Sequence, residues 1–506
     1  MTQSRSEAEA ILAYHEATKH SVESVRRGGH MLDFTNMPRP WKLYDASLPE
    51  TPLPSELTRT GVWVGDSLPG DGSPVVGDAE LTLSSLASVL QLSAGITKRL
   101  RAGNGYMYFR AAACTGALYH IELYVIAGPL ADLPAGVYQY GAHDNTLRML
   151  RDGDFRAVAV QAAGLAHTPA AIVVYTSTFW RNSWKYGSRT YRHAFWDCGT
   201  VLAHSLAAAR ANGVKADLVT RYADTPVNDL IVVDGETEVS VALLPLGAGP
   251  ETSPVDVPTR LDLPVVPLSR NPIDYPLIRE AHAATVLHDP APVRGGSMPA
   301  PGPTSSDGGL VSLGEAEPLT RTLEDVILQR GSSRRFAREP ISLPALAAML
   351  DAAGRPTGPD GADDGEVFNA LYVIANAVEG LEQGVYRYQP SLQALEPVTV
   401  SETRELAEHL DLDQPLGGDA AANLYFLADM PTVVSRWGAR GYRTAHFDAS
   451  IRAGRVYLAA YALGLGATGL TFYDDEVVEA LGAGPGSAVT FLVAVGVPWR
   501  NRRNTE

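Results

Sequence analysis

Apolar and polar residues follow one another along the chain in patterns that predict both strands and helices. Apolar runs predict buried strands, and they occur at residues 121–127, 171–176, 239–246, 370–375, 424–427 and 488–495. Apolar residues at helical spacing predict helices, and they occur at residues 7–26, 81–92, 319–329 and 343–353. Two longer predicted helices, residues 197–212 and 448–463, each end before a glycine, which favours the left-handed conformation of a helix end. The order of these elements predicts an α+β fold.

The same unit occurs twice in this order. One copy begins with GVYQY at Gly136 and the other with GVYRY at Gly384. An aspartate follows in each copy, 61 residues later at Asp197 (197 − 136) and 64 residues later at Asp448 (448 − 384). A repeat of this length indicates a duplicated domain, since the repeats of solenoid proteins are shorter. A fused pair of domains can form one shared site at its internal interface, with each half supplying different groups.

Changes in composition divide the chain into four segments. Residues 1–75 hold the first predicted helix and an extended arm, and residues 76–285 form the first domain. Residues 286–318 are too rich in proline, glycine and serine to form a packed core, so they predict a linker. Residues 319–506 form the second domain. The sequence therefore predicts an intrachain pseudo-dimer and leaves its further oligomerisation open.

The charge and the cysteine content exclude several classes of protein. The chain carries 41 basic and 57 acidic residues, a net charge of −16, which disfavours nucleic acid and anionic membranes as partners. Its two cysteines, Cys114 and Cys198, cannot build a disulfide framework or a zinc cluster. No apolar run is long enough to span a membrane, and the polar N-terminus is unlike a signal peptide. We therefore expect a cytoplasmic protein without a metal site.

A cluster of arginines and serines follows the helix predicted at residues 319–329. Arg330, Ser332 and Arg334 offer guanidinium groups and a hydroxyl, which can bind a phosphate through charge-assisted hydrogen bonds. The alternative is a solvated basic segment that complements the dipole at the end of the helix. The first half of the chain has no such cluster at the matching place.

Residues 464–469 match the dinucleotide-binding pattern G-x-G-x-x-G, but their context argues against it. That fingerprint follows a strand and opens a helix, whereas here a helix is predicted before the segment. We expect a tight turn instead, with backbone N–H groups that can face a ligand.

Lys185 and Tyr186 place an amine beside a phenol. A neighbouring ammonium group lowers the pKa of a tyrosine and makes it a plausible proton acceptor. The alternative is a lysine that extends along the surface next to a half-buried tyrosine, which is a common arrangement.

These residues together resemble the SagB-type azoline dehydrogenases, which are flavin enzymes of the nitroreductase superfamily. The resemblance rests on four stretches: HEATKHS from His15, RAAACTGALY from Arg110, WKYGSRTYR from Trp184 and GATGLTFYDD from Gly466. The family's ring-covering loop usually reads Pro-Ser-Ala-Gly, and ACTG from Ala113 stands in its place here. This departure leaves the hydroxyl but removes the proline.

The resemblance implies two tandem nitroreductase-like domains, each a mixed sheet flanked by helices, with one FMN per chain between them. From the second half, the phosphate and ribityl chain would be held by Arg330, Ser332 and Arg334, and a backbone N–H near flavin N5 would come from Thr468 and Gly469. From the first half, the ring would be covered by the loop containing Cys114, Thr115, Gly116 and Ala117, with Arg110 nearby. Each half lacks the parts that the other keeps, so a single FMN is expected.

The resemblance also implies a reaction. Lys185 and Tyr186 fall on the family's catalytic pair, so Tyr186 would remove a ring proton while hydride passes to FMN, which dioxygen would reoxidise. The substrate would be a thiazoline or oxazoline of a peptide natural product, oxidised to the azole among biosynthetic partner proteins. Two alternatives stay open: a flavin reductase that uses NAD(P)H on nitro or quinone compounds, and a non-catalytic protein with the same fold.

Overall fold

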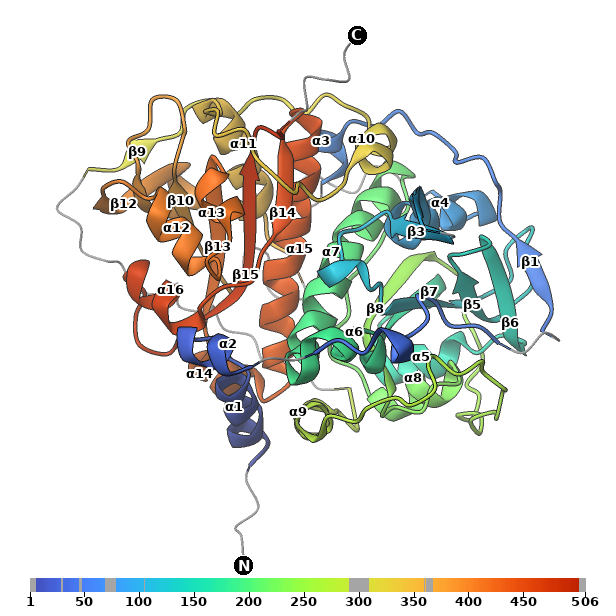
Figure 1. Ribbon diagram of the computed structural model, residues 1–506. Coiled ribbons are helices and arrows are strands. Elements are labelled where there is room, and N and C mark those ends of the chain that lie inside the picture. Colours follow the sequence, from blue (N-terminus) through green and yellow to red (C-terminus); the bar gives the residue numbers. More distant parts are fainter. Residues whose placement is uncertain are drawn as a thin grey trace, which may run out of the picture.

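The computed structural model describes residues 6–28, 31–44, 48–68, 79–103, 105–290, 309–358, 360 and 367–499. Two halves lie side by side, each built on its own antiparallel sheet (Figure 1). Two long helices, α7 (Thr190–Ala211) and α15 (Gly441–Ala462), run next to each other between the sheets. The predicted α+β class and the tandem organisation are confirmed. The mixed sheets that the family resemblance implied are wrong, because the described strands of both sheets pair in antiparallel fashion throughout.

The first half is built on a six-stranded sheet in the order β1-β6-β5-β4-β7-β8. Its strands are β1 (Glu50–Pro52), β4 (Ile121–Ala127), β5 (Gly136–Gly141), β6 (Thr146–Asp152), β7 (Pro169–Thr178) and β8 (Glu238–Ala248). Its other helices are α1 (Glu7–Ala17), α2 (Val22–Arg27), α3 (Val64–Ser67), α4 (Leu83–Ala94), α5 (Arg156–Ala163), α6 (Phe179–Tyr186) and α8 (Asp224–Leu230). A separate hairpin pairs β2 (Ile96–Ala102) with β3 (Gly105–Arg110).

The second half is built on a seven-stranded sheet in the order β14-β15-β13-β10-β11-β12-β9. Its strands are β9 (Val311–Ser312), β10 (Ala370–Ala375), β11 (Gly384–Gln389), β12 (Ala394–Val400), β13 (Ala422–Asp429), β14 (Gly466–Gly469) and β15 (Ser487–Gly496). Its other helices are α9 (Pro276–Thr285), α10 (Leu323–Gln329), α11 (Leu343–Gly354), α12 (Arg404–Leu410), α13 (Pro415–Asp419), α14 (Met430–Trp437) and α16 (Asp474–Ala480).

Small residues let α7 and α15 pack closely where they cross. Gly199 of α7 faces Ser450 of α15, and Gly454 of α15 faces Ala203 of α7. A side-chain carbon added at Gly454 would lie 2.5 Å from the Cβ atom of Ala203. Both pairs join matching positions of the two repeats, because 251 residues separate the members of each (450 − 199 and 454 − 203). Residues that meet their own counterparts mark a local two-fold axis, as in a symmetric dimer.

The segments that follow α1 and α9 bind across this axis in the same way. The N–H of His20 donates to Asp474 Oδ2 (2.8 Å), and the N–H of Asp474 donates to the carbonyl oxygen of His20 (3.0 Å). Leu287 and Asp224 exchange the same two hydrogen bonds, at 2.8 and 2.9 Å. Since α9 is thus the counterpart of α1, we propose that the second repeat begins at α9, which the sequence analysis placed in the first domain.

Two buried arginine pairs complete this exchange. Arg189 and Arg192 bind Asp474 at 3.1 and 2.6 Å, and their counterparts Arg440 and Arg443 bind Asp224 at 2.8 and 3.2 Å. All six side chains are buried. Removing one partner of such a pair leaves an uncompensated buried charge, so each aspartate ties the two halves together.

The predicted strands coincide with β4, β7, β8, β10, β13 and β15. The two long helices begin seven residues earlier than predicted, because the arginine-rich stretches at their starts are buried beneath α1 and α9. The single helix predicted at residues 7–26 is two helices, since Ser21 caps a new start. The tight turn predicted at residues 464–469 is confined to its start, where Gly464 has a positive φ of 74°, and the rest of the segment, Gly466–Gly469, forms β14 and pairs with β15. No helix in the described part of the chain is both long and apolar enough to cross a membrane.

Candidate active site

A cavity of about 530 Å³ opens between the two halves, a size typical of small-molecule sites. The first half contributes His20, Cys114, Thr115, Gly116, Lys185, Tyr186, His193, Trp196 and Asp197, among others. The second half contributes Ser332, Arg334, Tyr457, Thr468, Gly469, Phe472 and Phe491, among others. The structure therefore brings together seven of the ten cofactor-binding residues expected from the sequence and both members of the expected catalytic pair.

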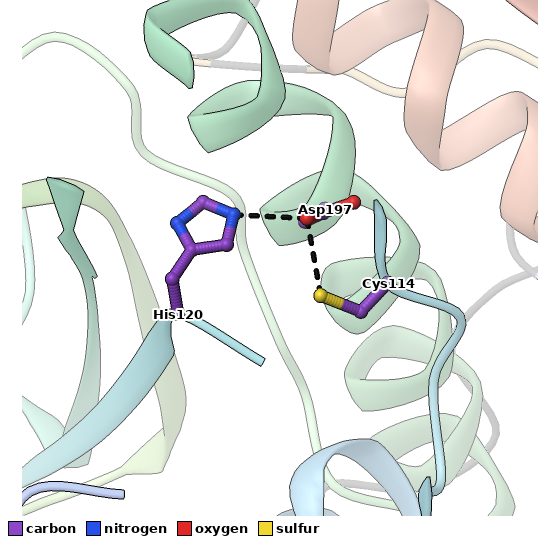
Figure 2. Close-up of side chains that lie close together, drawn as sticks. All are labelled: Cys114, His120 and Asp197. Carbon is purple, nitrogen blue, oxygen red and sulfur yellow. Dashed lines mark hydrogen bonds and ion pairs between the residues drawn. The ribbon is translucent and has the colours of Figure 1, made fainter. Parts of the chain in front are cut away.

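The loop that was expected to cover a flavin ring is held by one carboxylate. Asp197 Oδ1 accepts hydrogen bonds from the N–H of Thr115 (2.8 Å) and from its hydroxyl (2.7 Å). Asp197 Oδ2 accepts from the Cys114 thiol (3.1 Å) and lies 2.8 Å from Nε2 of His120. Figure 2 shows the side chains of Cys114 and His120 meeting at Asp197, which is carried by α7. The carboxylate thus fixes both ends of the loop to α7.

The other half uses its matching aspartate in the same way. Asp448 accepts hydrogen bonds from the hydroxyl of Thr357 (2.9 Å), the N–H of Phe368 (3.2 Å) and the amide of Asn369 (2.9 Å). Asn369 stands where His120 stands in the first half, one residue before the matching strand. Since an asparagine amide can only donate to a carboxylate, the matching role for His120 is donation from Nε2–H.

This symmetry explains a cluster that could otherwise suggest a metal centre. Ligand atoms of Cys114, His120 and Asp197 all lie within 4.8 Å of one another. The second half builds the same anchor without a cysteine or a histidine, so we interpret the cluster as a hydrogen-bonded loop anchor. The sequence identifies Asp197 as part of the repeat but gives no indication of this role.

Lys185 and Tyr186 lie in the last turn of α6, with the Lys185 Nζ atom 5.1 Å from the centre of the Tyr186 ring. The pKa of Tyr186 is raised above its ordinary value, first by burial and then by the negative charge of Asp197. The expected lowering of the Tyr186 pKa by Lys185 is therefore wrong. Tyr186 keeps its proton and can donate a hydrogen bond.

Arg330 and Arg110 do not line the cavity. Arg330 is buried and donates to the carbonyl oxygens of Ala111, Arg110 (3.0 Å) and Gly331 (3.0 Å), so it fastens the second half to the strand end before the loop. Arg110 donates to the carbonyl oxygens of Ile121 (3.1 Å) and Pro40 (3.0 Å). Of the predicted arginines, Arg334 alone is among the lining residues and exposed.

Two further expectations differ in detail. Ala117 belongs to the cavity loop, with a positive φ of 54°, but it is not among the residues that line the cavity. The N–H of Gly469 donates to the hydroxyl of Tyr457, so this donor already has a partner within the chain. A ligand that takes this N–H would displace the Tyr457 hydroxyl.

The sequence analysis did not predict several residues that face the cavity. His20, His193 and Trp196 belong to the first half, and Tyr457 and Phe472 belong to the second. Burial and the nearby Arg189 lower the pKa of His20 to about 3, so its imidazole is neutral over the physiological range. The repeat is the only feature of the sequence that bears on His20. Even so, His20 and Leu287 can be recognised as counterparts only once α1 and α9 are known to correspond.

Comparisons with known proteins agree with this fold. The model of the nitroreductase family matches residues 327–497. A "Putative nitroreductase" of Methanocaldococcus jannaschii is 32% identical over 165 residues, which cover 31% of this chain and 83% of that protein. The crystal structure of a "putative nitroreductase" from Anabaena variabilis matches with a TM-score of 0.77 and 26% identity, over 98% of this chain and 100% of that one. Fold and site define a nitroreductase-type oxidoreductase, and the chain belongs to the nitroreductase family.

Proposed function

We propose that the chain binds one FMN in this cavity and oxidises azolines to azoles. The observation that supports the proposal is the division of the cavity wall between the halves. The second half supplies Ser332 and Arg334, and Arg334 has no ion-pair partner among the described residues. The first half supplies the anchored loop and the Lys185–Tyr186 pair.

The donors in the cavity fit the cofactor. A guanidinium and a hydroxyl suit a phosphate, and the 530 Å³ cavity lies within the range of cofactor sites. FMN, when bound, accepts two electrons as a hydride. Trp196, Phe472 and Phe491 add apolar wall that excludes water from the reacting atoms.

The chain's own residues supply proton transfer and orientation. Oxidation of an azoline removes one hydride and one proton from adjacent ring atoms, and we assign the proton to the Lys185–Tyr186 pair. Tyr186 enters the reaction as a neutral phenol, because burial and Asp197 hold its proton. The phenol oxygen accepts the ring proton as the phenol's own proton passes to water, and Lys185, whose Nζ lies 5.1 Å from the ring centre, stabilises the negative charge that develops on that oxygen.

The first test is cofactor content and thiazoline oxidation by the purified chain. We expect one FMN per chain and formation of a thiazole from a short thiazoline peptide with dioxygen as oxidant. Tyr186→Phe and Lys185→Ala should lower kcat by about 10²-fold or more, as general acid–base groups do. The matched control is Arg436→Ala, at the position that corresponds to Lys185 in the other half. Unchanged rates in the first two variants with FMN retained would contradict the assignment.

A second function, reduction of nitro or quinone compounds with NAD(P)H, is favoured by the names of the matched relatives. Rapid bleaching of the bound flavin by NADH or NADPH under nitrogen, without thiazoline oxidation, would support this reaction in place of the first.

A further inference from the structure

The local two-fold axis allows residues that line the cavity to be compared with the matching residues of the other half. His20 follows α1 and Leu287 follows α9, and the two residues are fixed by matching backbone hydrogen bonds to Asp474 and Asp224. Their backbones are therefore equivalent, and only the side chains differ. The half that keeps the cavity places an imidazole where the other half places an apolar group.

Other residues that line the cavity also differ from their counterparts in the second half. His193 of α7 lines the cavity, and its counterpart in α15 is Thr444 (444 − 193 equals the 251-residue offset). Thr444 is buried, and its hydroxyl lies 3.2 Å from the hydroxyl of Thr220. The counterpart of Tyr186 is Trp437, which is buried against Phe368 with ring centres 5.0 Å apart. The second half has thus filled these places with packing contacts.

Hydrogen bonding fixes the state of His193. Its Nδ1 atom lies 2.9 Å from Asn182 Oδ1, and the Asn182 oxygen also accepts from the Thr190 hydroxyl at 2.9 Å. An amide oxygen can only accept, so Nδ1 carries the proton and Nε2 holds a lone pair. The ring packs edge-on against Tyr186, with centres 4.7 Å apart at 83°. This contact places the imidazole beside the proposed proton-transfer pair.

His20 is the less constrained of the two imidazoles. Within the described residues no hydrogen bond to its ring nitrogens is found, whereas its backbone is held at both the N–H and the carbonyl. A neutral imidazole offers one donor and one acceptor in a fixed plane. That pair of groups matches an azoline in a peptide, whose ring nitrogen accepts and whose neighbouring amide N–H donates.

We propose that His20, supported by His193, forms a substrate-binding subsite that hydrogen-bonds the azoline ring nitrogen or the adjoining peptide amide. The inference rests on the proposed azoline substrate. His20 binds and orients the heterocycle, and Lys185 and Tyr186 move its proton. In this arrangement the substrate contact comes from the N-terminal segment of the first half. The phosphate-binding groups of the same cavity come from the second half.

The test uses the FMN-loaded full chain and a short synthetic thiazoline peptide. Affinity is measured by calorimetric titration of the chain with its FMN already reduced and without oxygen, so that the peptide binds but is not oxidised, and KM and kcat are measured in air. His20→Leu, which installs the residue of the other half, should weaken binding and raise KM about tenfold, the effect of one lost hydrogen bond, with kcat within about twofold. His20→Gln should recover most of the affinity, because its amide can donate and accept. His288→Leu, in the matching exposed segment, is the control and should bind normally.

The outcomes separate this inference from the proposed function. Equal affinity of His20→Leu and wild type for the thiazoline peptide overturns the subsite, whatever the catalytic rates. A wild-type chain that does not bind the peptide also overturns it. A peptide that binds but is not oxidised contradicts the proposed reaction, while the comparison of affinities still decides the role of His20.

Discussion

Gly116 lets the cavity loop approach Tyr186 more closely than any side chain would permit. Its φ is 61°, in the left-handed region, and an added Cβ would lie 2.7 Å from the Tyr186 hydroxyl. Glycine is needed for conformation and for space at the same position. The position of the phenol therefore depends on a residue without a side chain.

Gly116→Ala should move Tyr186 and lower kcat at least about tenfold, with a loss of stability of about 1 kcal/mol or more from the strained backbone. Steady-state kinetics and thermal unfolding of the FMN-loaded chain measure the two effects. Gly103→Ala is the control, because Gly103 has a φ of 57° but no atoms within 4 Å of its added Cβ. Equal activity in both variants would contradict the steric argument.

Residues that line the cavity with their own side chains were easier to predict from the sequence than residues whose side chains bind backbone groups of other segments. Lys185, Tyr186 and Arg334 line the cavity as expected. Arg330 looked equivalent to Arg334 in the sequence, yet its guanidinium is used by backbone carbonyls that no residue pattern reveals. His20 could not be predicted, because its place depends on a contact with Asp474 more than 450 residues away.

At the scale of elements, the two loop anchors have the same construction and different consequences. Asp197 and Asp448 each hold the segment before a central strand, β4 or β10. Among the described residues of these two segments, those held by Asp197 face the cavity and those held by Asp448 do not. Loss of either carboxylate should therefore cost stability, and loss of Asp197 should also affect the ligand.

Asp197→Ala should weaken FMN binding at least about tenfold, because the loop from Cys114 to His120 loses a carboxylate that accepts from both of its ends. Asp448→Ala should lower the unfolding temperature with FMN affinity unchanged. Quenching of FMN fluorescence measures affinity, and calorimetry measures stability. If the two variants lose the same FMN affinity, the loop anchored by Asp197 has no special role in binding.

Element prediction succeeded where burial alone decides the pattern. The central strands are buried almost throughout because helices cover both faces, and their apolar runs were found directly. The starts of α7 and α15 were missed, because Arg189, Arg192, Arg440 and Arg443 look like surface residues in a sequence. Their burial becomes understandable only with the aspartates of the opposite half.

At the scale of the molecule, Asp474 and Asp224 join the halves at symmetric places. Burial alone would raise the pKa of each carboxyl, but two arginines outweigh it and the pKa of each lies below the ordinary value. A depressed folded-state pKa gives stability that is present above the unfolded-state pKa of about 3.9 and is lost as pH falls through the folded value. Both junctions should therefore weaken in strong acid.

Asp474→Asn and Asp224→Asn should each lower the free energy of unfolding at neutral pH by about 3–5 kcal/mol, since two buried arginines lose their counter-charge. Urea unfolding measures this loss, and the difference from wild type should shrink below about pH 4. The two variants should differ in the cavity, because Asp474 alone holds His20. A higher KM in Asp224→Asn than in Asp474→Asn would contradict this assignment.

The exchange of α1 also determines when the protein can be completed during its synthesis. The ribosome makes α1 more than 450 residues before Asp474, the aspartate that binds the segment after this helix. At about 5–20 residues per second, the apolar face of α1 waits on the order of 20–90 s for its binding place to be made. A stall in translation of the second half would leave the nascent chain with an uncovered helix and an unfinished catalytic centre, so the speed of elongation itself becomes a condition of correct assembly.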